Sequence, residues 1–446
     1  MKHSHLLLLL VLLFSVSLTA CKDDNNNGDN PNEPKYRRTV LVYMAAQNSL
    51  GAYGASKADS SEITYGIQYM QSTKDNVVLF IDDAMKPRIY RFYKSSNGKS
   101  YYQVLKTYSS DLSSTDPATL LDALTVMKTN CPSKSYGLVL WSHGTCWLPN
   151  ITSFTPLSST STTQSTTTSY RSTEAFGVDT GVGGDMVNDR TATGQIGPQM
   201  EIGDMADAIT QSGVHLDYIF FDACAMQSIE VAYALRNAAD YIVASPATTS
   251  AYGCAYVDQI RSGFFAYPAS DDSIKKMVDT YYYDVMENSE TKDYYKNQGC
   301  VFSVIKTSEL ENLAAATGQI ISKAISNKTS VDLTDFNGYI DFDITGYPNF
   351  YDMSSVMKKL LSDADYTSWK TVMDKCVIYQ KASDYFLYAQ KGSRNILSQV
   401  DKTTYCGVSM FIPQTKYTQS PAFLNFNDAF KQTAWYTAAG WAQTGW

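Results

Sequence analysis

Two short stretches of sequence decide the fold: residues 138–147 read LVLWSHGTCW, and residues 218–226 read YIFFDACAM. Each begins as an almost continuous run of apolar residues and ends in residues able to do acid–base or nucleophilic chemistry. Such runs are typical of strands that are buried on both faces, as in a parallel sheet covered by helices. Because the carboxyl ends of parallel strands meet at one edge of a sheet, we expect His143 and Cys224 to lie at the same edge.

Similar apolar runs recur along the chain and alternate with amphipathic stretches. The expected strands are residues 39–44, 76–81, 88–93, 136–142, 216–221, 241–245 and 301–305. The expected helices are residues 117–128, 201–211, 228–237, 272–286, 308–326 and 354–361. This alternation predicts an α/β/α sandwich with a mostly parallel central sheet. Beyond about residue 330 the pattern changes to Tyr- and Asp-rich helices and ends in an isolated strand at residues 405–413, which predicts a packed C-terminal subdomain over residues 331–446.

The N-terminus has the pattern of an export signal. Residues 1–20 contain an apolar run at residues 6–14 that is too short to span a bilayer, as in a secretory signal peptide. The run is followed by LTAC at residues 18–21, which resembles the bacterial lipobox, in which the cysteine is acylated and becomes the first residue. We therefore expect a lipid anchor at Cys21 in the bacterial cell envelope, on the periplasmic or surface-exposed face of the outer membrane. Residues 21–36 are polar and predict a flexible tether.

Composition narrows the classes of function. The 446 residues carry 36 Lys and Arg against 44 Asp and Glu, a formal net charge of −8, which argues against nucleic acid as a main partner. Setting Cys21 aside leaves seven of the eight cysteines, and an odd number leaves at least one thiol unpaired within the chain. Removing residues 1–20 leaves His143 and His215 as the histidines. His215 begins the strand that Cys224 follows, so it is a poor partner for that thiol.

A histidine and a cysteine at matching strand ends point to a nucleophilic hydrolase. Cys224 precedes an expected helix whose N-terminal dipole favours a thiolate. Gly144 allows the backbone to approach a substrate closely, and its N–H, like that of Cys224, is a candidate oxyanion donor. Both side chains also have structural interpretations, because a cysteine after an apolar strand is often a buried small hydrophobe. No G-x-S-x-G motif supports a serine hydrolase.

The same residues resemble the clostripain family of cysteine peptidases, which belongs to the caspase-like clan. Besides LVLWSHG and the DAC segment with its following helix, residues 39–50 (TVLVYMAAQNSL) and 405–413 (YCGVSMFIP) match the family. The resemblance implies a caspase-like fold and cleavage of peptide bonds after Arg or Lys. It implies that His143 is the catalytic histidine and Cys224 the nucleophile. Asp222 matches an acidic position implicated in binding a basic P1 side chain.

The resemblance implies a peptidase core at residues 37–330, which the C-terminal subdomain completes. A Ser/Thr- and Gly-rich insertion interrupts this core at about residues 150–197. The insertion is interpreted either as a flexible surface loop or as a cleavable or regulatory loop, because family members are activated by cleavage between the histidine and cysteine strands. Arg171 and Arg190 are the basic residues at which an enzyme specific for basic side chains would cut itself.

Several departures from the family pattern lie around the expected substrate pocket. Gln47-Asn48-Ser49-Leu50 replaces Asp-Asn-Asn-Leu, Cys146 stands at a position that is usually Gly, and Gly253-Cys254-Ala255-Tyr256 replaces Gly-aromatic-Pro-Tyr. These changes leave the catalytic pair intact but leave basic P1 specificity open. Cys146 and Cys254 fall on loops near the pair, where a disulfide and two unrelated thiols both fit the sequence.

The predicted chemistry requires no cofactor. The family often uses calcium, but Asp179, Asp185 and Asp189 in the insertion do not have the spacing of a D-x-[DN]-x-[DN]-G loop, so no metal ligands are assigned and calcium remains an open expectation. We expect a monomeric cysteine endopeptidase that acts on proteins or peptides. The alternative is a non-catalytic surface lipoprotein that uses its 33 Tyr to bind a glycan or a host protein on a peptidase-like scaffold.

Overall fold

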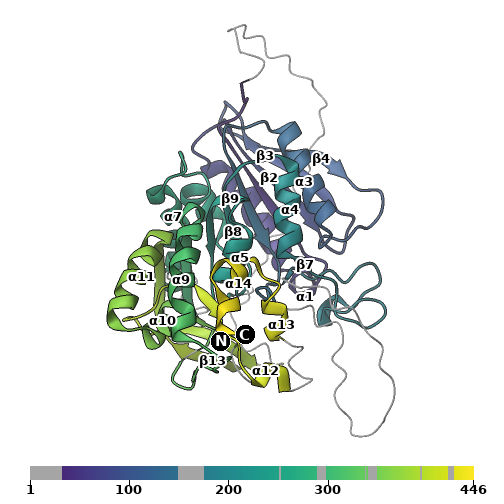
Figure 1. Cartoon of the computed structure of the whole chain (residues 1–446). Helices are drawn as coiled ribbons and strands as arrows, with labels where there is room; N and C mark the ends of the chain where they lie inside the picture. Colours follow the sequence, from purple (N-terminus) through teal and green to yellow (C-terminus); the bar gives the residue numbers. More distant parts are fainter. Residues whose placement is uncertain are drawn as a thin grey trace, which may run out of the picture. The chain divides into compact units, whose positions relative to one another are not determined.

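A mixed sheet of ten strands, in the order β13-β12-β10-β9-β8-β5-β1-β2-β3-β4, forms the centre of the described part of the chain (Figure 1). Its middle consists of parallel strands, which are β9 (Ala239–Ala244), β8 (Leu216–Asp222), β5 (Tyr136–Trp141), β1 (Arg38–Ala45) and β2 (Asp75–Asp82). Antiparallel strands flank this middle, namely β3 (Arg88–Lys94) and β4 (Ser100–Thr107) on one side and β10 (Gly299–Lys306), β12 (Val377–Lys391) and β13 (Arg394–Gln399) on the other. The prediction of an α/β sandwich around a parallel core is confirmed.

This computed structural model describes residues 33–148, 175–250, 253–288, 298–336, 338–339, 349–391, 394–419 and 426–446. The predicted signal peptide, Cys21, most of the predicted tether and Arg171 lie outside the described residues. Lys35–Trp446 cluster as one compact unit. Within the described residues, none of the helices has the length and apolar character needed to cross a bilayer.

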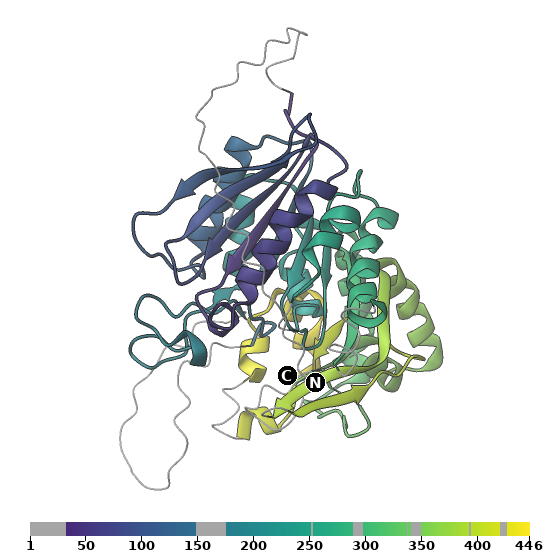
Figure 2. The ribbon, with the colours of Figure 1, turned by 180° about the vertical axis from the view of Figure 1, so that it is seen from behind.

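Alternate residues of the central strands enter two separate cores, one on each face of the sheet. Leu41 and Tyr43 of β1 pack on one face, and Val40 and Val42 pack on the other. On the first face lie α3 (Pro117–Asn130), α4 (Ile202–Ser212), α5 (Ile229–Ala234) and α9 (Leu310–Ala324), of which α3 and α4 cross in front of the strands in Figure 1. On the second face lie α2 (Ala55–Gly66) and α7 (Asp271–Tyr282), and α2 is the dark purple helix in front of the sheet in Figure 2. The strands are apolar on both faces because helices cover both.

The C-terminal region differs from the sequence expectation in its secondary structure. The helices α10 (Met353–Leu360) and α11 (Asp363–Cys376) are present, but residues 377–399 form β12 and β13 rather than helices. β12 pairs with β10, so this region extends the central sheet. The expected strand at residues 405–413 is β14 (Ser409–Phe411), and it is paired with β11 (Phe350–Asp352) rather than isolated.

Candidate active site

The strand register brings the two predicted catalytic segments together. Trp141, the last residue of β5, is paired with Asp222, the last residue of β8. His143 and Cys224 each lie two positions beyond these partners, so they leave the same edge of the sheet at the same level. A Cβ atom added to Gly144 would lie 2.3 Å from the Cys224 carbonyl oxygen, which shows how closely the two backbones approach. Only glycine fits at this position without a shift of the backbone.

The His143 ring is held on one side by hydrogen-bonding groups. Its Nε2 lies 2.9 Å from Ser49 Oγ and 3.6 Å from Asp189 Oδ2, and the side chain is 30% exposed. Burial lowers the pKa of His143 below its usual range, and the Asp189 carboxylate opposes that effect. The sequence pointed to Asp189 only as a candidate calcium ligand. Its contact with His143 could not be predicted, because the two residues are far apart in the chain.

Cys224 is partly buried, and its sulfur contacts the backbone and hydroxyl of Thr249. The Thr249 N–H donates to Sγ at 3.3 Å, and the Thr249 hydroxyl lies 3.5 Å from Sγ. Burial raises the pKa of Cys224, although the Thr249 hydrogen bonds oppose this. α5 begins at Ile229, beyond the N-cap Ser228, so its dipole falls off before it reaches the thiol. The expectation that a helix N-terminus stabilises a thiolate at Cys224 is therefore wrong.

Two residues close in sequence to His143 and Cys224 adopt left-handed backbone conformations. Ala225 has φ 63° directly after Cys224, and Cys146 has φ 64° three residues after His143. The conformation of Cys146 explains why this position is usually Gly in the family, since an L side chain is disfavoured there. Strained residues of this kind are common at active sites, where they aim the neighbouring functional groups.

Asp222 is buried and already accepts hydrogen bonds from this chain. Its Oδ2 receives the Cys254 N–H and the Tyr256 hydroxyl, both at 3.1 Å. Asp59, on α2, lies near Gly253 as Asp222 does, and it accepts from the Trp141 indole N–H at 2.6 Å. Burial raises the pKa of Asp59 to about 9 and that of Asp222 to about 6. The structure thus shows Asp222 capping the turn at residues 253–256, within a small acidic cluster.

The cysteines that follow the catalytic strands are not joined. All seven cysteines of the described residues carry reduced thiols. Cys146 packs in the core on one face of the sheet and Cys254 in the core on the other, so the sheet separates them. Of the two arrangements that the sequence allowed, the structure has the separate thiols.

The three aspartates of the insertion do not converge on a common point. Asp179 accepts from the Ser114 N–H and hydroxyl, Asp185 caps the turn at Asn188, and Asp189 accepts from Ser49. Each carboxylate therefore accepts hydrogen bonds from a different segment of the chain. These residues do not fit a calcium cage, which requires six to eight oxygen ligands around one ion.

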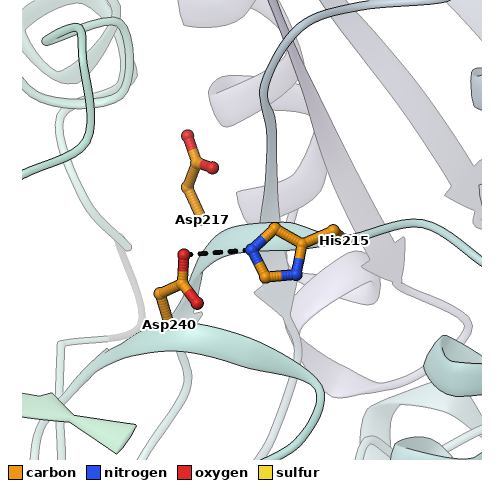
Figure 3. A group of neighbouring side chains, drawn as sticks. All are labelled: His215, Asp217 and Asp240. Carbon is orange, nitrogen blue, oxygen red and sulfur yellow. Dashed lines mark hydrogen bonds and ion pairs between the residues drawn. The ribbon is translucent and has the colours of Figure 1, made fainter. Parts of the chain in front are cut away.

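Among the described residues, one group has metal-ligating atoms close to one another, and Figure 3 shows it: His215, Asp217 and Asp240. Their ligand atoms lie within 4.8 Å of each other, and His215 Nε2 lies 3.0 Å from Asp240 Oδ2. His215 is 74% exposed and Asp240 52%, while Asp217 accepts from Arg38 at 2.5 Å. The group lies where β8 and β9 begin, at the opposite edge from Cys224. It therefore contributes nothing to chemistry at Cys224.

Comparison with known proteins agrees with this geometry. A model of the clostripain family matches residues 42–163 and 188–446. A secreted C11 cysteine protease from Bacteroides thetaiotaomicron, solved with an irreversible peptide inhibitor, is 26% identical with a TM-score of 0.69. An inactive zymogen C11 protease from Parabacteroides distasonis has the same identity and TM-score. Each comparison covers 91% of this chain and 99% of the other. Among curated proteins, no match was found. The predicted resemblance is thus confirmed, and residues 164–187, within the insertion, have no counterpart in the family model.

Proposed function

The chain belongs to the clostripain family of cysteine peptidases, and from this premise we propose that Cys224 and His143 are its catalytic pair. One observation carries the proposal. The register of β5 and β8 places the two strand ends side by side, with Gly144 against the Cys224 backbone. This arrangement puts a thiol and an imidazole, on two closely approaching backbone segments, at the carboxyl edge of a parallel sheet, where α/β proteins bind their ligands.

The proposed reaction proceeds through an acyl-enzyme. His143 accepts the Cys224 thiol proton as Sγ attacks the scissile carbonyl carbon, and the N–H groups of Gly144 and Cys224 donate to the resulting oxyanion. His143 then gives its proton to the leaving amine, and the acyl group remains on Sγ. Water, deprotonated by His143, attacks the acyl carbon, and the thiol is released with the carboxylate product. Each oxyanion donor contributes about 3 kcal/mol to transition-state stabilisation.

The proposed preference for Arg or Lys at P1 rests on the acidic cluster of Asp59, Asp222 and Glu62, a residue of α2 that accepts from the Tyr256 N–H at 2.9 Å. Asp222 Oδ2 already accepts from Cys254 and Tyr256, so a basic side chain that binds this oxygen must share it with them or displace them. The family resemblance and the formal net charge of −8 support a basic substrate.

A screen of fluorogenic peptides with all P1 residues, with and without calcium, tests the proposed function. Wild type should cleave a subset, and Cys224→Ala should reduce that cleavage by at least about 10³-fold. Cys131→Ala, which alters a buried cysteine at the end of α3, is the matched control and should retain activity. Stoichiometric labelling of Cys224 by a peptidyl electrophile would exclude the non-catalytic alternative. Absence of both cleavage and labelling would favour a surface lipoprotein that binds a glycan or a host protein.

We also propose that the protein is exported and held by a lipid on Cys21, and that cleavage within the insertion activates it. The similar structures include a secreted protease and an inactive zymogen, which supports both ideas. Labelling with an alkynyl fatty acid should mark wild type but not Cys21→Ala. Incubation should split wild type into two fragments at Arg171 or Arg190, whereas Cys224→Ala should remain intact.

A further inference from the structure

The loop between the histidine and cysteine strands returns to contact the catalytic histidine. Ser49, the first residue of the short helix α1 (Ser49–Ala52), follows β1 and lies between His143 and Asp189. Its backbone N–H donates to Asp189 Oδ1 at 2.7 Å, and its hydroxyl lies 3.0 Å from Asp189 Oδ2 and 2.9 Å from His143 Nε2. Three segments that are distant in sequence therefore meet at one edge of the imidazole.

The proton positions in this chain of contacts follow from what each group can donate. An ionised carboxylate only accepts, so the single hydroxyl proton of Ser49 points to Asp189. Ser49 Oγ must then accept from His143, which places a proton on Nε2. In the neutral ring the lone pair consequently lies on Nδ1.

We propose that Ser49 and Asp189 are positioning residues that hold His143 in its Nε2-protonated tautomer, so that Nδ1 exchanges the proton with Cys224. When Nδ1 takes that proton, the nearby Asp189 carboxylate stabilises the imidazolium. The catalytic consequence rests on the function proposed above, whereas the tautomer and the effect of Asp189 on His143 do not. A histidine that accepts and then returns a proton gains from a partner that fixes its tautomer.

The backbone around Asp189 holds its carboxylate in place. Asp185 and Arg190 exchange two backbone hydrogen bonds, of 2.7 and 2.9 Å, which close a tight hairpin around Asp189. The Gly197 N–H donates to the Asp189 carbonyl at 3.0 Å, and Asp189 itself adopts φ 55°, which aspartate tolerates better than most residues. Because this hairpin forms the last part of the insertion, a change elsewhere in the insertion that moves the hairpin also acts on His143.

The first experiment measures His143 without any substrate. Titration of ¹⁵N-labelled histidine by NMR, in the full chain carrying Cys224→Ala, should show the Nε2-protonated tautomer at high pH. Asp189→Asn should lower the pKa of His143, because it removes the carboxylate that raises it. Asp185→Asn is the matched control, since this exposed loop carboxylate caps Asn188 and should leave His143 unchanged. The His215 signal reports in each variant whether the chain is folded.

The second experiment measures cleavage. Asp189→Asn and Ser49→Ala should lower kcat/KM by about 10- to 100-fold, and Asp189→Asn should also move the acidic limb of the pH profile to lower pH. Ser49→Thr keeps the hydroxyl and should restore most of the lost activity. A loss of activity that left the limb in place would mean that the residues are merely structural, and it would overturn the proposal.

Three further outcomes would overturn the proposal: a proton on Nδ1 rather than Nε2, a His143 pKa that Asp189→Asn leaves unchanged, or higher activity in Asp189→Asn. The last would show that the contact is an inhibitory lock. Failure of wild type to cleave any peptide would contradict the proposed function alone, because the NMR titration would still report the tautomer and the effect of Asp189.

Discussion

The substitution Gly144→Ala tests the close approach of the two catalytic segments most directly. The added Cβ would lie 2.3 Å from the Cys224 carbonyl oxygen, 2.9 Å from the Met226 sulfur and 3.0 Å from Met226 Cγ. Ordinary contact begins at about 3.4 Å, so the two backbones must separate by roughly 1.1 Å. The methionine side chain is flexible, but the carbonyl belongs to the backbone of Cys224 itself. Relief of the clash therefore displaces Cys224 relative to His143.

The size of the clash sets the expected effect of Gly144→Ala on stability and on reaction rate. Overpacking of a well-packed interior costs about 1–3 kcal/mol, which is smaller than the total stability of an ordinary domain, so the variant should fold. A displacement of about 1 Å between reacting groups costs about 10²-fold in rate. Gly144→Ala should therefore lower kcat/KM by at least about 10²-fold, while unfolding in urea shows a loss of about 1–3 kcal/mol.

A second glycine provides the matched control. Gly203 lies in the first turn of α4, and a Cβ added there would have no atom within 4 Å. Gly203→Ala should leave kcat/KM unchanged and stabilise the chain by about 0.5–1 kcal/mol, because alanine favours the helix. Full activity of Gly144→Ala at unchanged stability would refute the proposed geometry.

Three further predictions concern the acidic cluster and the C-terminal strands. Because the pKa of Asp59 is raised to about 9, the folded state keeps a proton that the unfolded state releases near pH 4. Stability should therefore fall by up to about 1.4 kcal/mol per pH unit as the pH rises from about 4 to about 9. Asp59→Asn, which keeps an oxygen for the Trp141 indole, should flatten this fall in urea unfolding between pH 6 and 8. Asp222→Asn should lower kcat/KM for Arg and Lys substrates at least about tenfold more than for other accepted P1 residues, because the amide loses the charge but keeps an acceptor for the turn at residues 253–256. An equal loss on all substrates would mean that Asp222 serves only to hold this turn. A chain that ends at residue 330 should fail to fold cooperatively, as judged by circular dichroism and solubility, because β10 would lose its partner β12.

Much of the parallel centre of the sheet could be predicted because its strands are buried on both faces. β1, β2, β5 and β8 each read as continuous apolar runs, and this is the pattern that a sheet covered by helices requires. β12 was missed because its sequence, VIYQKASDYFLYAQK, mixes polar and aromatic residues without the apolar continuity of a central strand. Its strand character comes from pairing with β10, a tertiary contact that overrides local preference.

The positions of the candidate site residues could be predicted from the strand ends, but their ionisation could not. The placement of His143 and Cys224 follows from sheet topology, which the apolar runs indicate. The ionisation of the pair does not follow from sheet topology. The sequence suggested that a helix dipole lowers the pKa of Cys224, but α5 begins at Ile229, and burial is the main influence and raises that pKa. Burial is set by the whole fold, so a local motif does not report it.

The contact between Asp189 and His143 has a consequence for the role of the insertion. In the sequence, the insertion has few apolar residues able to form a core, and nothing in it predicts a contact with His143. In the structure its last part, residues 185–197, forms a hairpin that places the Asp189 carboxylate beside the His143 imidazole, and Ser49 contacts both. Where the family pattern commonly has Asn, this chain has Ser49, whose hydroxyl contacts both His143 and Asp189. Under the proposed mechanism, cleavage or movement of the insertion would therefore alter catalysis through the proton on Nε2, without changing either member of the proposed catalytic pair.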